Sequence, residues 1–492
     1  MRSIGRAILK GRVFFVAAIA VVTVVFGFAL PQLEVREDES TWFAKDNTAR
    51  IEYDRFKELF GFDRFIVVAY ETPDPFLKPE IEYLSHLTDV LGGLPYVEDA
   101  ISLTSIEETV FTSSGSFSRA FLRVSDAPRT EAQLCELDSR IGDNPFVEGT
   151  LISGDRQTVG IVLEIESPIS GNIYSEITHA LEEQLGRERS LTGRYFYYGG
   201  APVYDAKVTE TMDRDMRIFM PLTLLLSGIV LFLLFRNWRC VALPLLSVIL
   251  GIVWTFGLKA LTGSPVTPVS TTLIALVTII GVANSVHFMS HYRLELTRSS
   301  SREQAMLDTF ARAGTPCFLT SLTTAAGFGS LMVSNIPLIR HLGAFAGFGI
   351  MSAFVLTMVL LPVGLSGTAI RHDRTQRKSQ TWATFGAFAV QHSRALIMLS
   401  IIFSLAMSLG GWRIQIEPSM TKYLKPSSPA RQAADYFDAR LSGSSSIELL
   451  LEGPPGSFER TEILRTIDHL QDSIENHAYV AQSFSIVDYV KS

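Results

Sequence analysis

The stretch STWFAKDNTARIEYDRFKELFGFDRFIVVAYE begins at Ser40, and a similar stretch, MTKYLKPSSPARQAADYFDARLSGSSSIELLLE, begins at Met420. Each stretch follows a hydrophobic run, and each predicts a linker, a helix and an apolar strand. Internal repeats of this kind are typical of membrane proteins that are built from two similar halves, so we expect one half followed by the opening of a second. Identical residues recur at matching positions: Ala49 and Ala430, Arg50 and Arg431, and Phe56 and Phe437.

Seven long runs without formal charge underlie the hydrophobic content of 47%. Each run is about 18 residues or longer, which is enough for a helix to cross roughly 30 Å of hydrocarbon. Buried core helices of a large soluble protein are the alternative, but five runs in close succession favour membrane spans. The runs are 13–33, 218–235, 240–258, 260–292, 313–339, 341–370 and 395–412.

The first run follows a basic leader, so it could be a secretory signal or a retained anchor. It is long for a signal and lacks a convincing small-x-small cleavage site, so we expect an anchor. The predicted parts are a cytoplasmic N-terminus (1–12), a first membrane helix (13–33), an α+β domain (34–216), five membrane helices (217–370), a basic linker (371–394), a seventh membrane helix (395–412) and the start of a second α+β domain (413–492).

Basic residues cluster in four segments that fall on one side if the seven runs alternate in direction. They are the N-terminus, the turn with Arg236 and Arg239, the connection 291–312 and the linker 371–394. Lys and Arg concentrate on the cytoplasmic side of membrane helices. We therefore expect a multi-pass protein of the bacterial inner (plasma) membrane, with both α+β segments in the periplasm. The polar and apolar alternation of 294–314 predicts either an amphipathic helix on the membrane surface or a solvated connector.

Strands and helices alternate through the first external segment. Strands are expected at 64–71, 96–103, 118–125, 158–167 and 194–200, and helices at 78–94, 131–141 and 173–185. Such units predict an α+β domain of ferredoxin-like type, in a chain that is otherwise a polytopic α-helical membrane protein. We find no nucleophile motif, phosphate-binding loop or His/Cys cluster, and the three cysteines are far apart, so no enzyme activity, metal or cofactor is expected.

Two segments of the predicted bundle carry long motifs. IGVANSVHFMSHYRLEL spans 280–296, and LTSLTTAAGF (319–328) and IPLIR (336–340) follow it in order. These segments resemble the fourth to sixth helices of the resistance–nodulation–division (RND) superfamily, in the branch of the mycobacterial large membrane proteins (MMPL), hopanoid transporters and sterol-sensing-domain proteins. The resemblance implies twelve helices, two porter domains and export of hydrophobic or amphiphilic molecules, often lipids and often driven by protons.

One departure from that family bears on energy coupling. Proton-driven members carry an Asp in the fourth helix where this chain has Ala283 and Asn284, and the seven runs contain no Asp or Glu. An intramembrane carboxylate is costly and is usually kept for ion coupling. His287, three residues after Asn284 and expected on nearly the same face, is either a proton relay or a structural hydrogen-bonding group. The further candidates for transport or relay are Ser285, Thr320, Ser321, Thr323 and Thr324.

Small residues on the same helices are expected to serve close packing or hinges, because they let helices approach. They are Gly281, Gly327 and Gly329. Serine and threonine hydroxyls on these helices could bond across helices or to their own backbone.

The resemblance implies a membrane transporter of hydrophobic or amphiphilic molecules, with lipids as substrate and surroundings, and with proton coupling left open. The alternative is a lipid-binding or lipid-sensing module that does not pump, and a truncated half-transporter is a third possibility because the chain stops at Ser492. A partner could be a second copy or a second half. Nucleic acid is not an expected partner, and the substrate's identity does not follow from the sequence.

Overall fold

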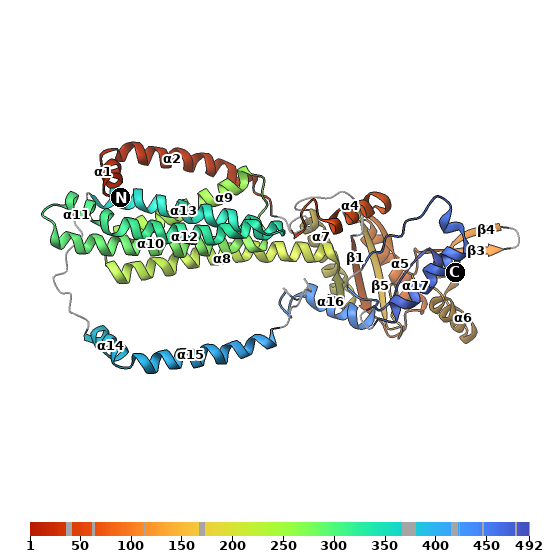
Figure 1. Ribbon diagram of the computed structural model, residues 1–492. Helices are drawn as coiled ribbons and strands as arrows, with labels where there is room; N and C mark the ends of the chain where they lie inside the picture. The colour runs from red at the N-terminus through yellow and green to blue at the C-terminus, as the bar shows by residue number, and fades with distance from the viewer. Residues whose placement is uncertain are drawn as a thin grey trace.

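The computed structural model describes residues 1–35, 42–61, 64–112, 115–166, 173–366, 380–414, 422, 424–444, 447–477 and 480–491. A bundle of long helices and an α+β domain lie end to end (Figure 1). Seven helical segments of the described chain are long and apolar enough to cross a membrane, so the prediction of a polytopic helical membrane protein is confirmed. Ser40, Met420, Ser492 and residues 371–379 of the basic linker lie outside the described residues.

The bundle is formed by helices from the first three quarters of the chain. Its central helix, α13, packs against α9, α10 and α12 and is the most deeply buried of the spans. The bundle elements are α1 (Arg2–Lys10), α2 (Arg12–Ala29), η1 (Leu30–Gln32), α8 (Ala201–Phe235), α9 (Arg239–Leu261), η3 (Pro268–Ser270), α10 (Thr271–Arg298), α11 (Arg302–Thr309), η4 (Phe310–Gly314), α12 (Thr315–Gly329), η5 (Ser330–Val333) and α13 (Pro337–Ser366).

Small residues set the spacing at the centre of the bundle. A Cβ atom at Gly349 of α13 would lie 2.7 Å from Thr255 Oγ1 of α9 and 2.7 Å from Val277 Cγ2 of α10. Real Cβ atoms do not approach that closely, so glycine is what allows these three helices to meet. The stretch 294–314, for which an amphipathic helix is one expectation, is divided among the end of α10, the short helix α11 and the π-helical turn η4, which continues into α12.

The α+β domain contains a four-stranded antiparallel sheet in the order β2-β5-β1-β6. This order, with one helix between β1 and β2 and another between β5 and β6, is the ferredoxin-like arrangement predicted from the sequence. The domain consists of α4 (Thr48–Phe60), β1 (Phe65–Glu71), α5 (Lys78–Gly92), β2 (Val97–Ile101), β3 (Glu107–Thr112), β4 (Gly115–Ala120), η2 (Val124–Asp126), α6 (Glu131–Gly142), β5 (Thr158–Ile165), α7 (Ile173–Thr192) and β6 (Phe196–Gly199).

A hairpin of β3 and β4 is inserted between the second and third strands of the main sheet and forms a separate two-stranded sheet. The strand expected at 118–125 is therefore misplaced. The chain leaves β4 at Ala120 and forms a short 3-10 turn, Val124–Asp126. The alternation of side chains beyond Ala120 imitates a strand, but no neighbouring strand pairs with it in the described chain.

A glycine joins the two parts of the molecule. Gly200, between β6 and α8, has φ +122°, and a Cβ atom there would collide with the carbonyl oxygen of Phe65. Only glycine adopts this conformation without strain. The helix α8 then runs without interruption from the α+β domain through the bundle (Figure 1), so the boundary expected at 216 falls inside a continuous helix.

The last quarter of the chain is described as seven helical elements. They are α14 (Gln380–Gln391), α15 (Ser393–Gly410), η6 (Gly411–Arg413), α16 (Pro429–Arg440), α17 (Thr461–Glu475) and α18 (Ile486–Lys491), with the short turn η8 (Ser457–Glu459) before α17. The apolar helix α15 buries no residue and lies apart from the bundle (Figure 1).

The apolar strand that the second repeat was expected to form after its helix is not observed, because residues 447–452 are not in a strand. Its apolar side chains at Ile447, Leu449 and Leu451 are exposed. A strand requires a paired neighbour, and the described chain offers none to this segment.

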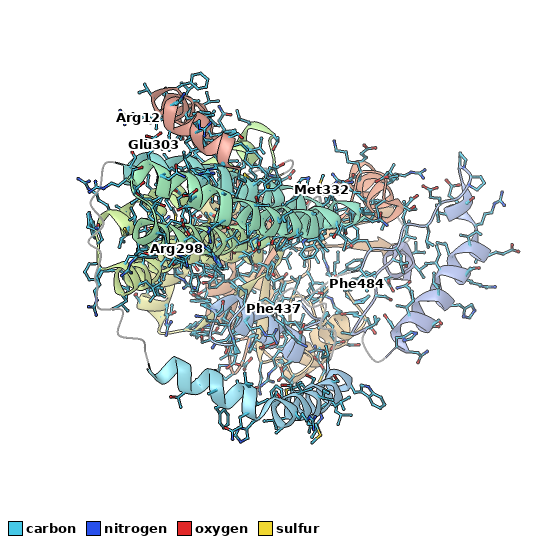
Figure 2. All side chains as sticks on the ribbon, turned by 60° about the vertical axis from the view of Figure 1, so that its left-hand side comes forward. Arg12, Arg298, Glu303, Met332, Phe437 and Phe484 are labelled. Atoms are coloured by element: carbon cyan, nitrogen blue, oxygen red, sulfur yellow. The ribbon has the colours of Figure 1, made fainter. Side chains whose placement is uncertain are left out.

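The helix α16 packs instead on the sheet of the first α+β domain. Side chains of β1 alternate: Ile66, Val68 and Tyr70 face the core shared with α5 and α7, whereas Ala69 faces Phe437 of α16. A segment of the second repeat therefore covers the face of the sheet that α5 and α7 leave free. Figure 2 shows Phe437 beside the strands.

Candidate functional site

The predicted intramembrane site centres on two side chains that the structure brings together. Asn284 of α10 and Ser321 of α12 are both buried, and the Asn284 side-chain amide donates a hydrogen bond of 3.0 Å to the Ser321 hydroxyl oxygen. A buried amide without a partner would be costly in the apolar interior of a bundle. The pair therefore ties α10 to α12 without a titratable group.

The other predicted hydroxyl groups bond within their own helices. Ser285 donates to the backbone oxygen of Gly281 at 2.8 Å. The threonine hydroxyls of α12 do the same along that helix: Thr320 to Pro316, Thr323 to Leu319 and Thr324 to Thr320. Such bonds satisfy the hydroxyl locally. Among the predicted serine and threonine side chains, Ser321 is the one whose hydroxyl bonds to another helix in the described structure.

His287 does not join the Asn284 pair. Asn284 is buried, whereas His287 and Ala283 are exposed on the surface of α10, so the expected common face is not observed. Positions three apart in a helix differ by about 60° in direction, which is enough to separate a buried from an exposed position. Whether His287 carries protons stays a prediction.

The predicted glycines fall into two groups. A Cβ atom at Gly281 would lie 2.9 Å from Val248 Cγ2 of α9, so this glycine permits close packing of α9 and α10. At Gly327 and Gly329 nothing lies within 4 Å of such an atom. A packing role for these two residues of α12 stays a prediction.

Two buried charged side chains of the bundle were not predicted as site residues, because each apolar run was ended at the nearest charged residue. Lys259, between the runs 240–258 and 260–292, is 1% exposed in the last turn of α9, and its Nζ lies 4.7 Å from the centroid of the Phe345 ring. A lone lysine between two apolar runs was the available signal. Glu295 is 3% exposed near the end of α10, and its Oε1 lies 3.4 Å from nitrogens of both Arg298 and Arg312.

Lys259 lines a cavity of about 690 Å³ at the end of the bundle that is nearest to the α+β domain. The walls come from the segment before α4, the first turn of α4, the end of α9, the connection to α10 and the first turns of α13. This volume is in the range of pockets that hold small ligands. The lining residues are Phe43, Ala44, Lys45, Asp46, Arg50, Lys259, Pro265, Thr267, Val269, Ser270, Leu273, Pro337, Leu338, Arg340, His341, Leu342 and Phe345.

Basic side chains gather at the opposite end of the bundle. Figure 2 shows Arg12 and Arg298 toward that end, with Glu303 near them, and Met332 toward the other end. Ion pairs hold this region: Arg2 contacts Asp308 at 2.8 Å. The two ends of the bundle therefore differ. One end carries basic side chains, and the end next to the α+β domain holds the cavity.

The bundle of apolar helices and the ferredoxin-like domain define a polytopic membrane protein with an α+β domain. Residues 117–396 match the model of the MMPL family, and the chain belongs to that family. Among its relatives is the hopanoid transporter HpnN of Burkholderia multivorans, 24% identical over 53% of this chain and 27% of the relative. The probable transport protein MmpL8 of Mycobacterium bovis is 22% identical over 58% of this chain and 27% of its own length.

A third relative, the human protein dispatched homolog 3, is 27% identical over 34% of this chain and 12% of its own length. The chain spans less than half of the length of these relatives. The predicted membership of the RND, MMPL and sterol-sensing-like group is thereby confirmed.

Proposed function

We propose that this protein moves hydrophobic or amphiphilic molecules, lipids among them, across or out of the membrane. The observation that carries the proposal is the cavity of about 690 Å³ where the bundle meets the α+β domain. It has apolar walls from Phe345, Leu273 and Leu342 and a polar rim, which suits a molecule with a tail and a headgroup. Family membership and relatives that are named as transporters support the same function.

We further propose that the basic end of the bundle is cytoplasmic and that the α+β domain is periplasmic, in a bacterial inner membrane. The end of α8, the start of α9 and the end of α10 lie at the end of the bundle away from that domain (Figure 1). Arg236 directly follows α8, Arg239 begins α9, Arg293 is near the end of α10, and Arg312 is in η4. The positive-inside rule supports this orientation. Because Cys135 of the α+β domain is itself exposed, the test uses a Cys135→Ser background. There a cysteine introduced at exposed Lys78 of α5 should react with a membrane-impermeant maleimide in intact cells, and one introduced at Trp238 should not.

The alternative proposal is a lipid sensor that binds without transport. The Asn284–Ser321 hydrogen bond favours it, because an amide at this position cannot take up or release a proton at physiological pH. Coupling would then require His287, a carboxylate elsewhere, or no protons at all. The two functions differ in how they respond to energy, which gives a clear test.

The test follows a fluorescent lipid in proteoliposomes before and after an ionophore dissipates the proton gradient. A proton-coupled transporter releases lipid to acceptor vesicles only with the gradient. An uncoupled transporter releases it in both states, faster than protein-free vesicles do. Lipid that binds equally in both states without any protein-dependent release favours the sensor and contradicts the transport proposal.

A further inference from the structure

Lys259 is the feature of the cavity that a purely apolar substrate does not explain. The residue is 1% exposed, lies one turn from the end of α9, and contacts the face of the Phe345 ring. Within the described chain no carboxylate lies within ion-pair distance of its ammonium group. Ionisable side chains that are buried at membrane depth are costly and are kept for function.

Other basic groups face the same space from different elements. Arg340 and His341 come from the second turn of α13, and Lys45 and Arg50 come from the segment that leads into α4. Arg50 is engaged, because it donates to the Phe43 backbone oxygen at 2.9 Å and pairs with Asp54 at 3.5 Å. Lys45 and Arg340 have no such partner among the described residues, so within this part of the chain positive charge predominates at the cavity.

Negative charge in the cavity wall is sparse. Among the described lining residues, Asp46 supplies one carboxylate, whereas Lys45, Lys259 and Arg340 supply three cations. Apolar side chains lie directly beside these cations, notably Phe345 under the Lys259 ammonium and Leu273, which is 1% exposed. The cavity therefore places fixed positive charge beside a hydrophobic wall.

We propose that this cavity binds an amphiphile with an anionic headgroup, in which the anion sits between Lys259 and Arg340 and the tail lies along Phe345, Leu273 and Leu342. The inference rests on the proposed transport function and specifies its substrate class. An anion supplies a countercharge for buried Lys259, which has none among the described residues, and in a low-dielectric site that interaction is stronger than in water.

The test measures binding to the full chain in phosphatidylcholine nanodiscs by calorimetry. Three probes separate the sources of affinity: octyl phosphate, octyl glucoside and inorganic phosphate. Octyl phosphate should bind more tightly than either of the others, because it alone offers both an anion and a tail. Equal binding of octyl glucoside would overturn the need for charge, and equal binding of inorganic phosphate would identify a free-anion site instead.

Matched variants locate the interaction. Lys259→Met should weaken octyl phosphate binding by more than about tenfold and leave octyl glucoside unchanged, because loss of a buried charge partner acts on the anion alone. Lys259→Arg should retain most of the affinity. Lys78→Met, on the exposed face of α5, is the control of equal chemistry and should change nothing. Unchanged octyl phosphate binding in Lys259→Met would overturn the proposal.

Folding and transport are read separately. Lys259→Met removes an unpaired buried charge, so its thermal unfolding should be equal to or higher than that of the natural chain. Protein that releases neutral lipid from vesicles yet fails to bind octyl phosphate would refute the anionic class and leave transport standing. Protein that binds octyl phosphate but releases no lipid would refute transport and leave the anionic ligand class standing.

Discussion

The side-chain amide of Asn284 and the hydroxyl oxygen of Ser321 are 3.0 Å apart and join α10 to α12 inside the helical bundle. Both residues are buried, so each satisfies a polar group that would otherwise be left in an apolar environment. The Asn284 amide, which does not titrate at physiological pH, therefore links the two helices.

Removing either partner should destabilise the bundle. Asn284→Ala leaves a buried hydroxyl without its donor, and Ser321→Ala leaves a buried amide without its acceptor. We expect each change to cost about 1–2 kcal/mol in unfolding free energy, with the double variant costing less than the sum. Thermal unfolding in detergent measures this. Thr323→Ala, whose hydroxyl bonds only to its own helix, is the control, and an additive double variant would contradict a direct interaction.

His287 is the remaining titratable candidate within the fourth span. If it relays protons, the double variant Asn284→Ala, His287→Ala should lose all acceleration of lipid release by a pH gradient, because no titratable group remains at this position. Release rates from proteoliposomes at a series of imposed gradients measure it. A double variant that keeps its full gradient dependence would refute a relay through His287.

The docking of α16 on the first sheet centres on Phe437, beside Tyr436, whose ring stacks on that of Tyr197 with 3.7 Å between the centroids. Phe437 is 2% exposed, and a Cβ atom at Gly199 would lie 2.9 Å from its ring. Phe437→Ala should cost about 3–5 kcal/mol, as expected for a buried aromatic. Limited proteolysis between α15 and α16 should then release the C-terminal segment. Phe60→Ala, at a side chain 68% exposed, is the control and should leave the cleavage rate unchanged.

The ion pair of Glu80 with Arg194 makes the α+β domain sensitive to acid. Arg194 donates to both carboxylate oxygens, at 2.7 and 2.5 Å, and these hydrogen bonds lower the pKa of Glu80 below its usual value of 4.5. A lowered carboxyl pKa contributes stability above the unfolded value, and that stability is lost as the pH falls through the folded value.

We therefore expect the unfolding temperature of the α+β domain to fall below about pH 4.5, and Glu80→Gln to flatten that part of the curve. Calorimetry between pH 3 and 7 measures it. Glu183→Gln is the matched control, because the Glu183–Arg187 pair is exposed on α7. A Glu80→Gln curve that is parallel to that of the natural chain would contradict this account.

Sequence patterns predicted the architecture well because long apolar runs and period-two strands are strong local signals. The alternation of strand and helix patterns predicted a ferredoxin-like domain, and the observed order β2-β5-β1-β6 is the order of that class. The strand at 447–452 could not be excluded locally, because its formation depends on a partner strand. The continuous helix α8 also lacked a signal, because the charged residues before Ile218 resemble a connection but belong to one helix.

The candidate site was only partly predictable. Asn284 and Ser321 came from motif resemblance, but their contact depends on how α10 and α12 rotate against each other. His287 was placed by its spacing in the helix, and tertiary packing turned it outward. Lys259 was not predicted, because dividing the chain into uncharged runs leaves an isolated charged residue between two runs. A buried charge in a membrane bundle is nevertheless a strong indication of function.

The most direct test of the central claim fills the cavity. Val269→Trp places a large side chain in its wall, and Val230→Trp, at an exposed position of α8, is the matched control. Both proteins are reconstituted, and the initial rate of fluorescent lipid transfer to acceptor vesicles is measured. We predict that Val269→Trp lowers the protein-dependent rate to near that of protein-free vesicles while Val230→Trp does not. Equal rates for Val269→Trp and the natural chain would show that the cavity is not on the substrate's path.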